Sequence, residues 1–179
     1  MLGGIMMKSR VFFYLTVLII SVFTFACRSG NENKKTVYKL SKNEMADMNS
    51  YLIQKDRERI QSYFERKGLS MQESPTGLWY NISKEGNGDF LKENERIRYE
   101  YDCELLDGSK YYNSQELGAA EIQIGRSELP MGLYEGLKLL KRGGEAIFII
   151  PPFLAYGLVG DGKKIPPRAT LVYSIRVLE

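Results

Sequence analysis

The chain has 179 residues, a formal net charge of +3 and no histidine. This length is enough for one domain with an appendage and too short for two full domains. The absence of histidine excludes a Ser-His-Asp triad, a Cys-His dyad and a histidine zinc site. Only two cysteines occur, Cys27 and Cys103, so a thiolate metal cluster is excluded as well. We therefore expect no metal and no cofactor, and chemistry that uses aromatic surface, hydroxyls, carboxylates or backbone amides.

The positive charges are spread along the chain, and no basic run is interleaved with aromatic residues. Proteins that bind the phosphates of nucleic acids usually have such a basic patch or stripe. We therefore predict no nucleic-acid partner.

The N-terminal residues have the pattern of a secretory signal. Lys8 and Arg10 precede the apolar residues 11–26, a run shorter than the about 20 apolar residues of a comfortable membrane span. A basic start, a short apolar stretch and a small residue are typical of a signal peptide. We assign residues 1–26 to the signal and the polar residues 27–40 to a tether without regular structure.

The end of this signal, Thr24-Phe25-Ala26-Cys27, resembles a bacterial lipobox, in which the cysteine is acylated and becomes the mature N-terminus. Phe25 departs from the strict pattern, which has a small residue at that position. Two or three acyl chains anchor a protein far more firmly than one. The resemblance implies a lipid anchor at Cys27, in the inner or outer membrane of the cell envelope, facing the periplasm. The alternative is an uncleaved membrane anchor with an incidental cysteine.

Residues 42–67 are predicted to form an amphipathic helix. Ser41 and Glu44 have the spacing of a capping box, and Gly68 indicates the helix end. The apolar residues, spaced near the helical period, are Met45, Met48, Leu52, Ile60, Tyr63 and Phe64. This stripe fits a homodimer interface, an arm that holds client proteins, or packing against the following domain. We favour packing, since the stripe is interrupted around residues 55–59.

Residues 71–179 are predicted to form an α+β domain, an antiparallel sheet of about five strands wrapped on one short helix. In the clearest strand, residues 97–105, apolar side chains alternate with charged ones, as in a sheet with one buried face. The other predicted strands are residues 77–84, 121–124, 146–150 and 171–178. Turns are predicted at residues 86–88 and at Asp107-Gly108, and the short helix at residues 133–141.

Four motifs in this domain resemble those of the FKBP-type peptidyl-prolyl cis-trans isomerases. The pattern Tyr-x-Tyr-x-x-x-Leu-x-Asp-Gly at residues 99–108 resembles the family's second strand, and residues 133–144 resemble its helix and glycine turn. The most specific stretch is Ala155-Tyr156-Gly157 followed by Ile-Pro-Pro-x-Ala-Thr-Leu-Val-Tyr at residues 165–173. The resemblance covers about residues 75–179. The layout of lipobox, helix and domain is also similar to isomerase lipoproteins associated with gliding motility in the Bacteroidetes.

The resemblance implies an FKBP-like fold and isomerase activity on proline-containing polypeptide clients, assisting the folding of envelope or secreted proteins. It places Tyr101, Tyr156 and Ile165 in the catalytic site, with the Tyr156 hydroxyl and the Ile165 N–H as donors to the substrate. The substrate-binding residues that it implies are Tyr111, Tyr112, Ile122, Leu129, Pro130, Leu133 and Tyr173. For Tyr99 we expect ordinary core packing.

Three departures from the family pattern bear on activity. Tyr112 stands where members usually have an aspartate that helps to hold the cleft, and Leu133 where they have the tryptophan of the pocket floor. Leu129-Pro130 replaces the usual Val-Ile pair. These changes favour lower activity and weaker binding of macrolide inhibitors. They leave open a non-catalytic peptide-binding module or holding chaperone with an FKBP fold, and a structural subunit of an envelope machine.

Overall fold

The structure is a computed structural model, and it describes residues 40–179. The predicted signal peptide, Cys27 and the tether up to residue 39 lie outside the described residues.

The predicted N-terminal helix is confirmed as α2 (Lys42–Lys67). It ends at Gly68, whose φ of +64° suits a residue without a Cβ atom. The Leu69 N–H then donates to the Phe64 carbonyl over 2.9 Å, which satisfies one of the last carbonyls of the helix. Within residues 40–179, no helix is both long and apolar enough to cross a membrane.

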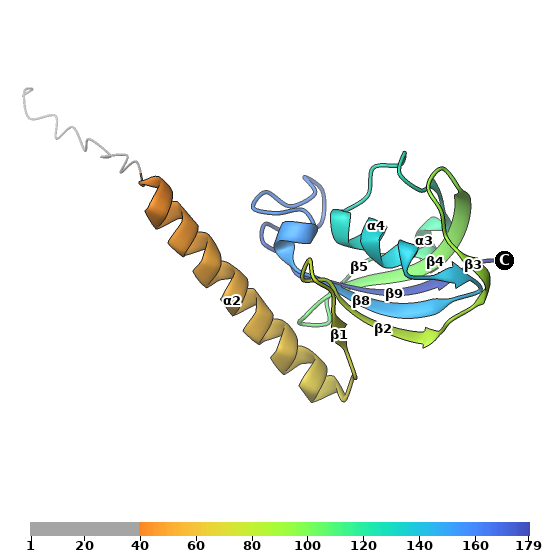
Figure 1. The fold of residues 1–179 in the computed structure, drawn as a ribbon, viewed down its shortest axis with the longest axis horizontal. Helices are drawn as coiled ribbons and strands as arrows, with labels where there is room; N and C mark the ends of the chain where they lie inside the picture. Colours follow the sequence, from red (N-terminus) through yellow and green to blue (C-terminus); the bar gives the residue numbers. More distant parts are fainter. Residues whose placement is uncertain (1–39) are drawn as a thin grey trace, which may run out of the picture. The chain divides into compact units, whose positions relative to one another are not determined.

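Seven strands form one antiparallel sheet, and two more form a separate pair (Figure 1). The order across the sheet is β1 (Gln72–Glu73), β2 (Trp79–Lys84), β8 (Glu145–Ile150), β9 (Leu171–Val177), β4 (Arg96–Leu105) and β5 (Lys110–Asn113). The remaining pairings join β6 (Ala120–Gln123) to β4, and β3 (Asn87–Phe90) to β7 (Lys141–Arg142). Strand β4 is therefore paired with β9 on one edge and with β5 and β6 on the other.

The five strands predicted from the sequence are confirmed as β2, β4, β6, β8 and β9, at nearly the predicted ends. The four that were missed, β1, β3, β5 and β7, have only two to four residues, too few to show alternation. The turn predicted at residues 86–88 is only partly right. Gly86 turns the chain with a φ of +80°, but Asn87 and Gly88 already belong to β3.

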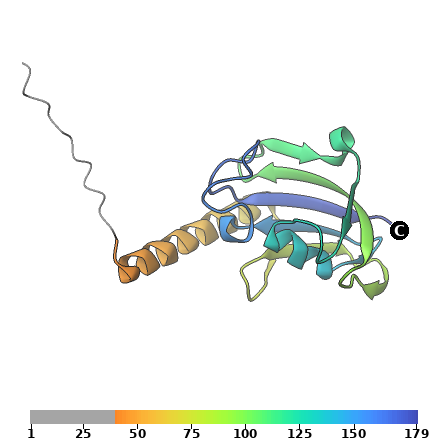
Figure 2. The ribbon, with the colours of Figure 1, turned by 90° about the horizontal axis from the view of Figure 1, so that it is seen from above.

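The short helix predicted at residues 133–141 is α4 (Met131–Lys138), which begins two residues earlier and ends three residues earlier than predicted. It packs on the inner face of the curved sheet (Figures 1 and 2). Two glycines let it approach closely: a Cβ atom on Gly136 would lie 2.9 Å from the Phe148 ring, and one on Gly132 would lie 2.5 Å from Ile150 Cγ2. The main core lies between α4 and the sheet. Two further short helices, α3 (Ser114–Leu117) and η1 (Pro152–Leu154), lie in the connections.

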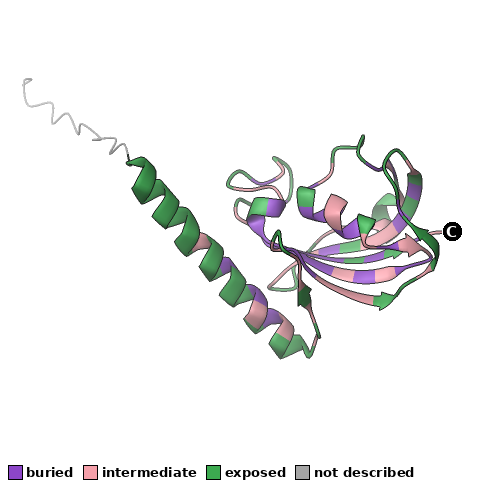
Figure 3. Cartoon of the chain, viewed as in Figure 1, coloured by how far each residue is buried: buried purple, intermediate pink, exposed green. Residues whose placement is uncertain are grey.

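The second half of α2 covers part of the outer face of the sheet (Figure 3). Ile60 and Tyr63 are 1% and 4% exposed, and they pack in a cluster with Trp79. In the first half of the helix, Met45 and Met48 are 46% and 49% exposed. The expectation that the apolar stripe packs on the domain is therefore right for the second half of α2 and wrong for the first.

Replacing Ile60 with alanine should lower the free energy of unfolding by about 2–5 kcal/mol, because the change leaves a cavity under the helix. Ile53→Ala on the same helix is the control: Ile53 is 47% exposed, and its loss should cost less than about 0.5 kcal/mol. Both values come from urea denaturation followed by the fluorescence of Trp79, the single tryptophan of the chain. Equal losses from the two changes would contradict the docking of α2 on the sheet.

Candidate active site

A cleft of about 770 Å³ is bounded by β4, β9, the start of α4 and the loop that follows η1. Its lining residues are Tyr99, Tyr101, Tyr112, Leu117, Ala120, Glu128, Leu129, Pro130, Met131, Leu133, Ala155, Tyr156, Asp161, Lys163 and Tyr173. Aromatic and aliphatic side chains dominate this list, and a few polar groups join them. Such a composition is typical of a site that binds a small apolar group in a defined orientation.

Three tyrosine rings from two adjacent strands form one wall of the cleft. The ring centroids of Tyr99 and Tyr101 are 5.7 Å apart, and those of Tyr101 and Tyr173 are 6.1 Å apart. The rings are tilted against one another, an arrangement that is favourable for aromatic pairs at these distances. Tyr99 is 4% exposed, as expected for a core residue, but it also lines the cleft.

The Tyr156 hydroxyl is one of the polar groups of the cleft without a hydrogen-bond partner among the described residues, as are the hydroxyls of Tyr99 and Tyr101. Tyr156 is half-buried, and within residues 40–179 its hydroxyl makes no hydrogen bond. Burial, and then the negative charge of Asp161, raises the pKa of this hydroxyl above its ordinary value. Tyr156 therefore keeps its proton at neutral pH and can donate a hydrogen bond to a group that enters the cleft.

Asp161 organises the loop that borders the cleft. Its Oδ2 accepts a hydrogen bond from the Tyr112 hydroxyl over 2.6 Å, and its Oδ1 accepts from the backbone N–H groups of Lys163 and Ile165 over 2.9 and 2.8 Å. Burial alone would raise the pKa of Asp161, but these hydrogen bonds lower it overall. The same contact raises the pKa of Tyr112 to about 12. The Asp161 carboxylate of the loop is therefore bonded to Tyr112, the position at which the resemblance predicts an aspartate.

The predicted role of the Ile165 N–H as a substrate donor disagrees with the structure. That N–H already donates to Asp161, and the Ile165 side chain is 3% exposed in the core. The reason is the geometry of the loop, in which the Asp161 side chain, four residues earlier in the chain, accepts the hydrogen bond of the Ile165 N–H. The Tyr156 hydroxyl, by contrast, makes no hydrogen bond within residues 40–179 and lines the cleft.

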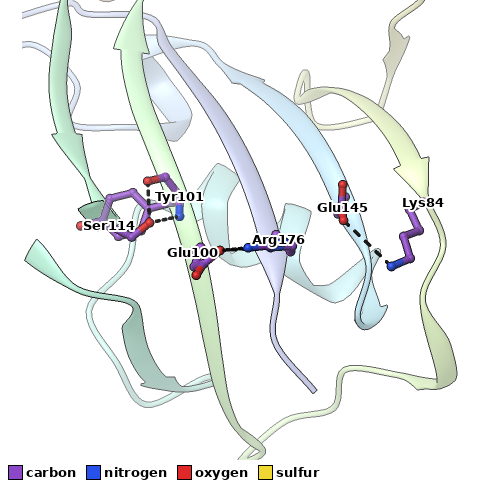
Figure 4. Close-up of polar contacts among 6 residues, drawn as sticks. All are labelled: Lys84, Glu100, Tyr101, Ser114, Glu145 and Arg176. Carbon is purple, nitrogen blue, oxygen red and sulfur yellow. Dashed lines mark hydrogen bonds and ion pairs between the residues drawn. The ribbon is translucent and has the colours of Figure 1, made fainter. Parts of the chain in front are cut away.

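Ser114 holds Tyr101 at a point where β4 lacks a neighbour. One edge of β4 pairs with β6 up to Tyr99 and with β5 from Asp102 onward. Between them, Ser114 Oγ accepts from the Tyr101 N–H over 2.9 Å and donates to the Tyr101 carbonyl over 3.1 Å (Figure 4). One hydroxyl therefore satisfies both backbone groups that the strand pairing leaves open. Neither Ser114 nor its role follows from the sequence pattern.

The structure brings most of the predicted site residues together. Those in the lining of the cleft are Tyr101, Tyr112, Leu129, Pro130, Leu133, Tyr156 and Tyr173. Those outside the lining are Tyr111, Ile122 and Ile165, which pack in or against the main core. The lining residues that the sequence did not indicate include Leu117, Met131 and Asp161. For Asp161 a signal was available, because an aspartate between two glycines is typical of a turn whose side chain bonds its own backbone.

A second hollow, of about 570 Å³, lies on the outer face of the sheet. It is lined mainly by polar side chains, among them Glu100, Asp102 and Arg176. Glu100 and Arg176 form an ion pair across adjacent strands, and Lys84 Nζ lies 4.0 Å from Glu145 Oε1 (Figure 4). These four charges are already paired, and the hollow offers little apolar surface for binding. We therefore assign the site to the tyrosine-lined cleft.

Cys103 lies behind the cleft, on β4 opposite Tyr173 of β9. It is 1% exposed, and burial raises the pKa of its thiol to about 11. A thiolate is the reactive form of cysteine, so this thiol is not poised to act as a nucleophile.

A comparison with protein families decides what the domain is. The sequence profile of the FKBP-type peptidyl-prolyl cis-trans isomerases matches residues 88–178, more than half of the chain and the whole tyrosine-lined cleft. The chain belongs to this family. The matched residues include β4 to β9, α4 and the loop that carries Tyr156 and Asp161, and we refer to them with the rest of the sheet as the FKBP domain.

Curated relatives and solved structures agree with this assignment. The FKBP-type isomerase FkpA of Escherichia coli K12 is 34% identical over 125 residues, which cover 70% of this chain and 45% of that protein. A probable FKBP-type isomerase of Haemophilus influenzae is 34% identical over 113 residues, covering 63% and 46%. This chain therefore spans less than half the length of these curated relatives.

Two crystal structures are similar to this FKBP domain. FkpA of Escherichia coli superposes with a TM-score of 0.60 at 28% identity, covering 79% of this chain and 73% of that one. AtFKBP13 superposes with a TM-score of 0.57 at 28% identity, covering 62% of this chain and 98% of that one.

Replacing Asp161 with alanine should lower the free energy of unfolding at pH 7 by about 1–3 kcal/mol, because a charged acceptor of three hydrogen bonds is lost. The folded-state pKa of Asp161 is lowered, so its stabilisation is present above the unfolded pKa near ~4 and is lost as pH falls through the folded value. The gap between the two proteins should therefore be smaller at pH 3 than at pH 7. Denaturation at both pH values measures it, with Asp102→Ala on the exposed outer face as control. A gap independent of pH would contradict the role of the carboxylate.

Proposed function

We propose that the protein is a peptidyl-prolyl cis-trans isomerase that binds Xaa-Pro segments of polypeptide clients in the tyrosine-lined cleft. One observation carries the proposal: an aromatic wall of Tyr99, Tyr101 and Tyr173 faces a cleft whose Tyr156 hydroxyl has no partner within residues 40–179. The wall suits the compact, apolar ring of proline. The hydroxyl suits the carbonyl of the amide that rotates.

This chemistry needs no nucleophile, base or metal. Rotation about the Xaa-Pro bond has a barrier of about 18–20 kcal/mol, and no bond is broken. The transition state is a twisted amide that has lost its resonance and much of its dipole. An apolar cleft favours that state over the planar amide, which loses more hydration on entry. A thousandfold acceleration requires only about 4 kcal/mol of preferential stabilisation.

Tyr156 supplies the directed part of that stabilisation. A tyrosine hydroxyl is protonated at neutral pH, and burial raises the pKa of Tyr156 further, so this hydroxyl donates to the carbonyl oxygen of the twisted amide. Asp161 contributes indirectly, since its hydrogen bonds hold the loop on which Tyr156 lies and fix the Tyr112 ring. Leu117 and Met131 are each 62% exposed at the mouth, and they offer apolar surface to the residues that flank the proline.

Tyr156→Phe should lower kcat/KM for an Xaa-Pro tetrapeptide about tenfold, the value of one hydrogen bond of about 1.4 kcal/mol. A protease-coupled assay of cis-to-trans exchange measures it, and Tyr80→Phe on β2, outside the cleft lining, is the control. Equal activity of the Tyr156 variant and the parent protein would contradict the assignment of the cleft.

A holding chaperone or peptide-binding module is the second candidate. The observation that favours it is the exposed apolar surface of the loop after η1, where Leu158 and Val159 are 70% and 80% exposed. Well-folded protein that does not accelerate exchange, yet suppresses aggregation of a proline-free client, would establish this second function in place of the first.

We further propose that the protein is anchored to the cell envelope through lipid on Cys27 and acts there on envelope or secreted clients. The support is the sequence Thr24-Phe25-Ala26-Cys27 after the apolar run. Cells grown with an alkyne fatty acid should label the parent protein and Cys103→Ser, whose change is in the core, but not Cys27→Ser. Membrane fractionation should show the same division. Label retained on Cys27→Ser would contradict the anchor.

A further inference from the structure

The inference concerns a buried ion pair between α2 and the loop of the FKBP domain that borders the cleft. Asp56, on the face of α2 toward the domain, has a side chain that is only 6% exposed. Its Oδ2 accepts a hydrogen bond from Arg168 Nη2 over 2.8 Å, across 112 positions of sequence. A buried carboxylate is costly without a partner, so this contact constrains both elements.

Arg168 lies where the cleft loop returns to the sheet. Its φ of +57° is a left-handed conformation, unfavourable for a residue with a Cβ atom, so the surroundings must hold it there. Its backbone N–H donates to the Gly157 carbonyl over 2.8 Å. Gly157 directly follows Tyr156 in the chain. Arg168 therefore joins the end of the loop to its beginning at Gly157, next to Tyr156, and Asp161 lies between these two ends.

Apolar packing does not replace this contact. A hollow of about 280 Å³, lined by Leu52, Phe153 and Leu158 among others, lies between α2 and the loop around the ion pair. The loop lies beside α2 in both views of the ribbon (Figures 1 and 2). Side chains leave that space open, so the ion pair bridges it and holds the loop against α2.

We propose that Asp56 and Arg168 are positioning residues, through which α2 holds the loop of Tyr156 in its binding-competent arrangement. The proposal rests on the proposed isomerase function for its kinetic consequence. The helix then sets substrate affinity as well as covering the outer face of the sheet. Loss of the ion pair leaves the competent arrangement only partly populated, which weakens apparent substrate binding by that fraction without changing the chemical step.

The chain provides a matched control. Arg57, the next residue on α2, pairs with Glu73 on β1 and so also joins the helix to the domain. That pair lies away from the cleft loop. Glu73→Gln therefore removes a helix–domain ion pair without touching the loop, and Asp56→Asn removes the pair that holds it.

In the full-length protein, Asp56→Asn should raise KM for an Xaa-Pro peptide about three- to tenfold with kcat unchanged, as expected for a partly populated competent state. A merely destabilised fold would lower kcat and leave KM unchanged, because fewer molecules are active. Amide hydrogen exchange in residues 155–168 should become about tenfold faster, as expected from local opening. Glu73→Gln should match the parent protein in both measurements. Asp56→Glu should restore most of the affinity.

Two results would overturn the proposal: Asp56→Asn that matches Glu73→Gln in both KM and exchange, or exchange that rises equally across the whole domain. If the parent protein does not accelerate isomerisation, the proposed function fails, and the exchange of residues 155–168 alone decides this inference. If Asp56→Asn loses its far-UV circular dichroism, Arg168→Gln takes its place, because it removes the same pair from the exposed side.

Discussion

The gap in strand pairing at Tyr101 lies at the tyrosine-lined cleft of this FKBP domain. Strand β4 is paired along one edge with β9, but on the other edge the chain leaves it after Asn113 and returns at Ala120. The Ser114 hydroxyl forms hydrogen bonds with both the N–H and the carbonyl of Tyr101, the backbone groups that lack a strand partner in this gap. The excursion between the two strands carries Leu117 to the mouth of the cleft, and the Tyr101 ring faces the opening.

The opposite side of the cleft is held by carboxylates that come from outside the strands. Asp161 curls the loop back on itself and fixes Tyr112, while Asp56 on α2 holds Arg168 at the end of the same loop. The Asp161 carboxylate accepts a hydrogen bond from Tyr112 and so stands beside the tyrosines, where it gives this side of the cleft a polar support.

Local patterns predicted most of this fold, because burial of one face imposes a period that is visible in the residues themselves. Residues 97–105 alternate, and they form β4 with Ile97, Tyr99 and Cys103 buried. Strands β3 and β7 are too short for any period, and the pairing between them was therefore missed. The motif around Tyr156 located the cleft. Tyr112 lies 49 positions from Asp161, and Arg168 lies 112 positions from Asp56, and such distant contacts leave no periodic signal.

The central claim is that the tyrosine-lined cleft binds an Xaa-Pro segment and speeds its rotation. Exchange NMR on a peptide with resolved cis and trans signals tests this directly, with a catalytic amount of the protein added. The account predicts exchange cross-peaks within the mixing time, where the free peptide takes tens to hundreds of seconds. It also predicts that shifts of the protein's amide signals concentrate on β4, β9 and residues 155–165. Binding at those residues without exchange, or exchange that persists in Tyr156→Phe with Tyr101→Ala, would contradict it.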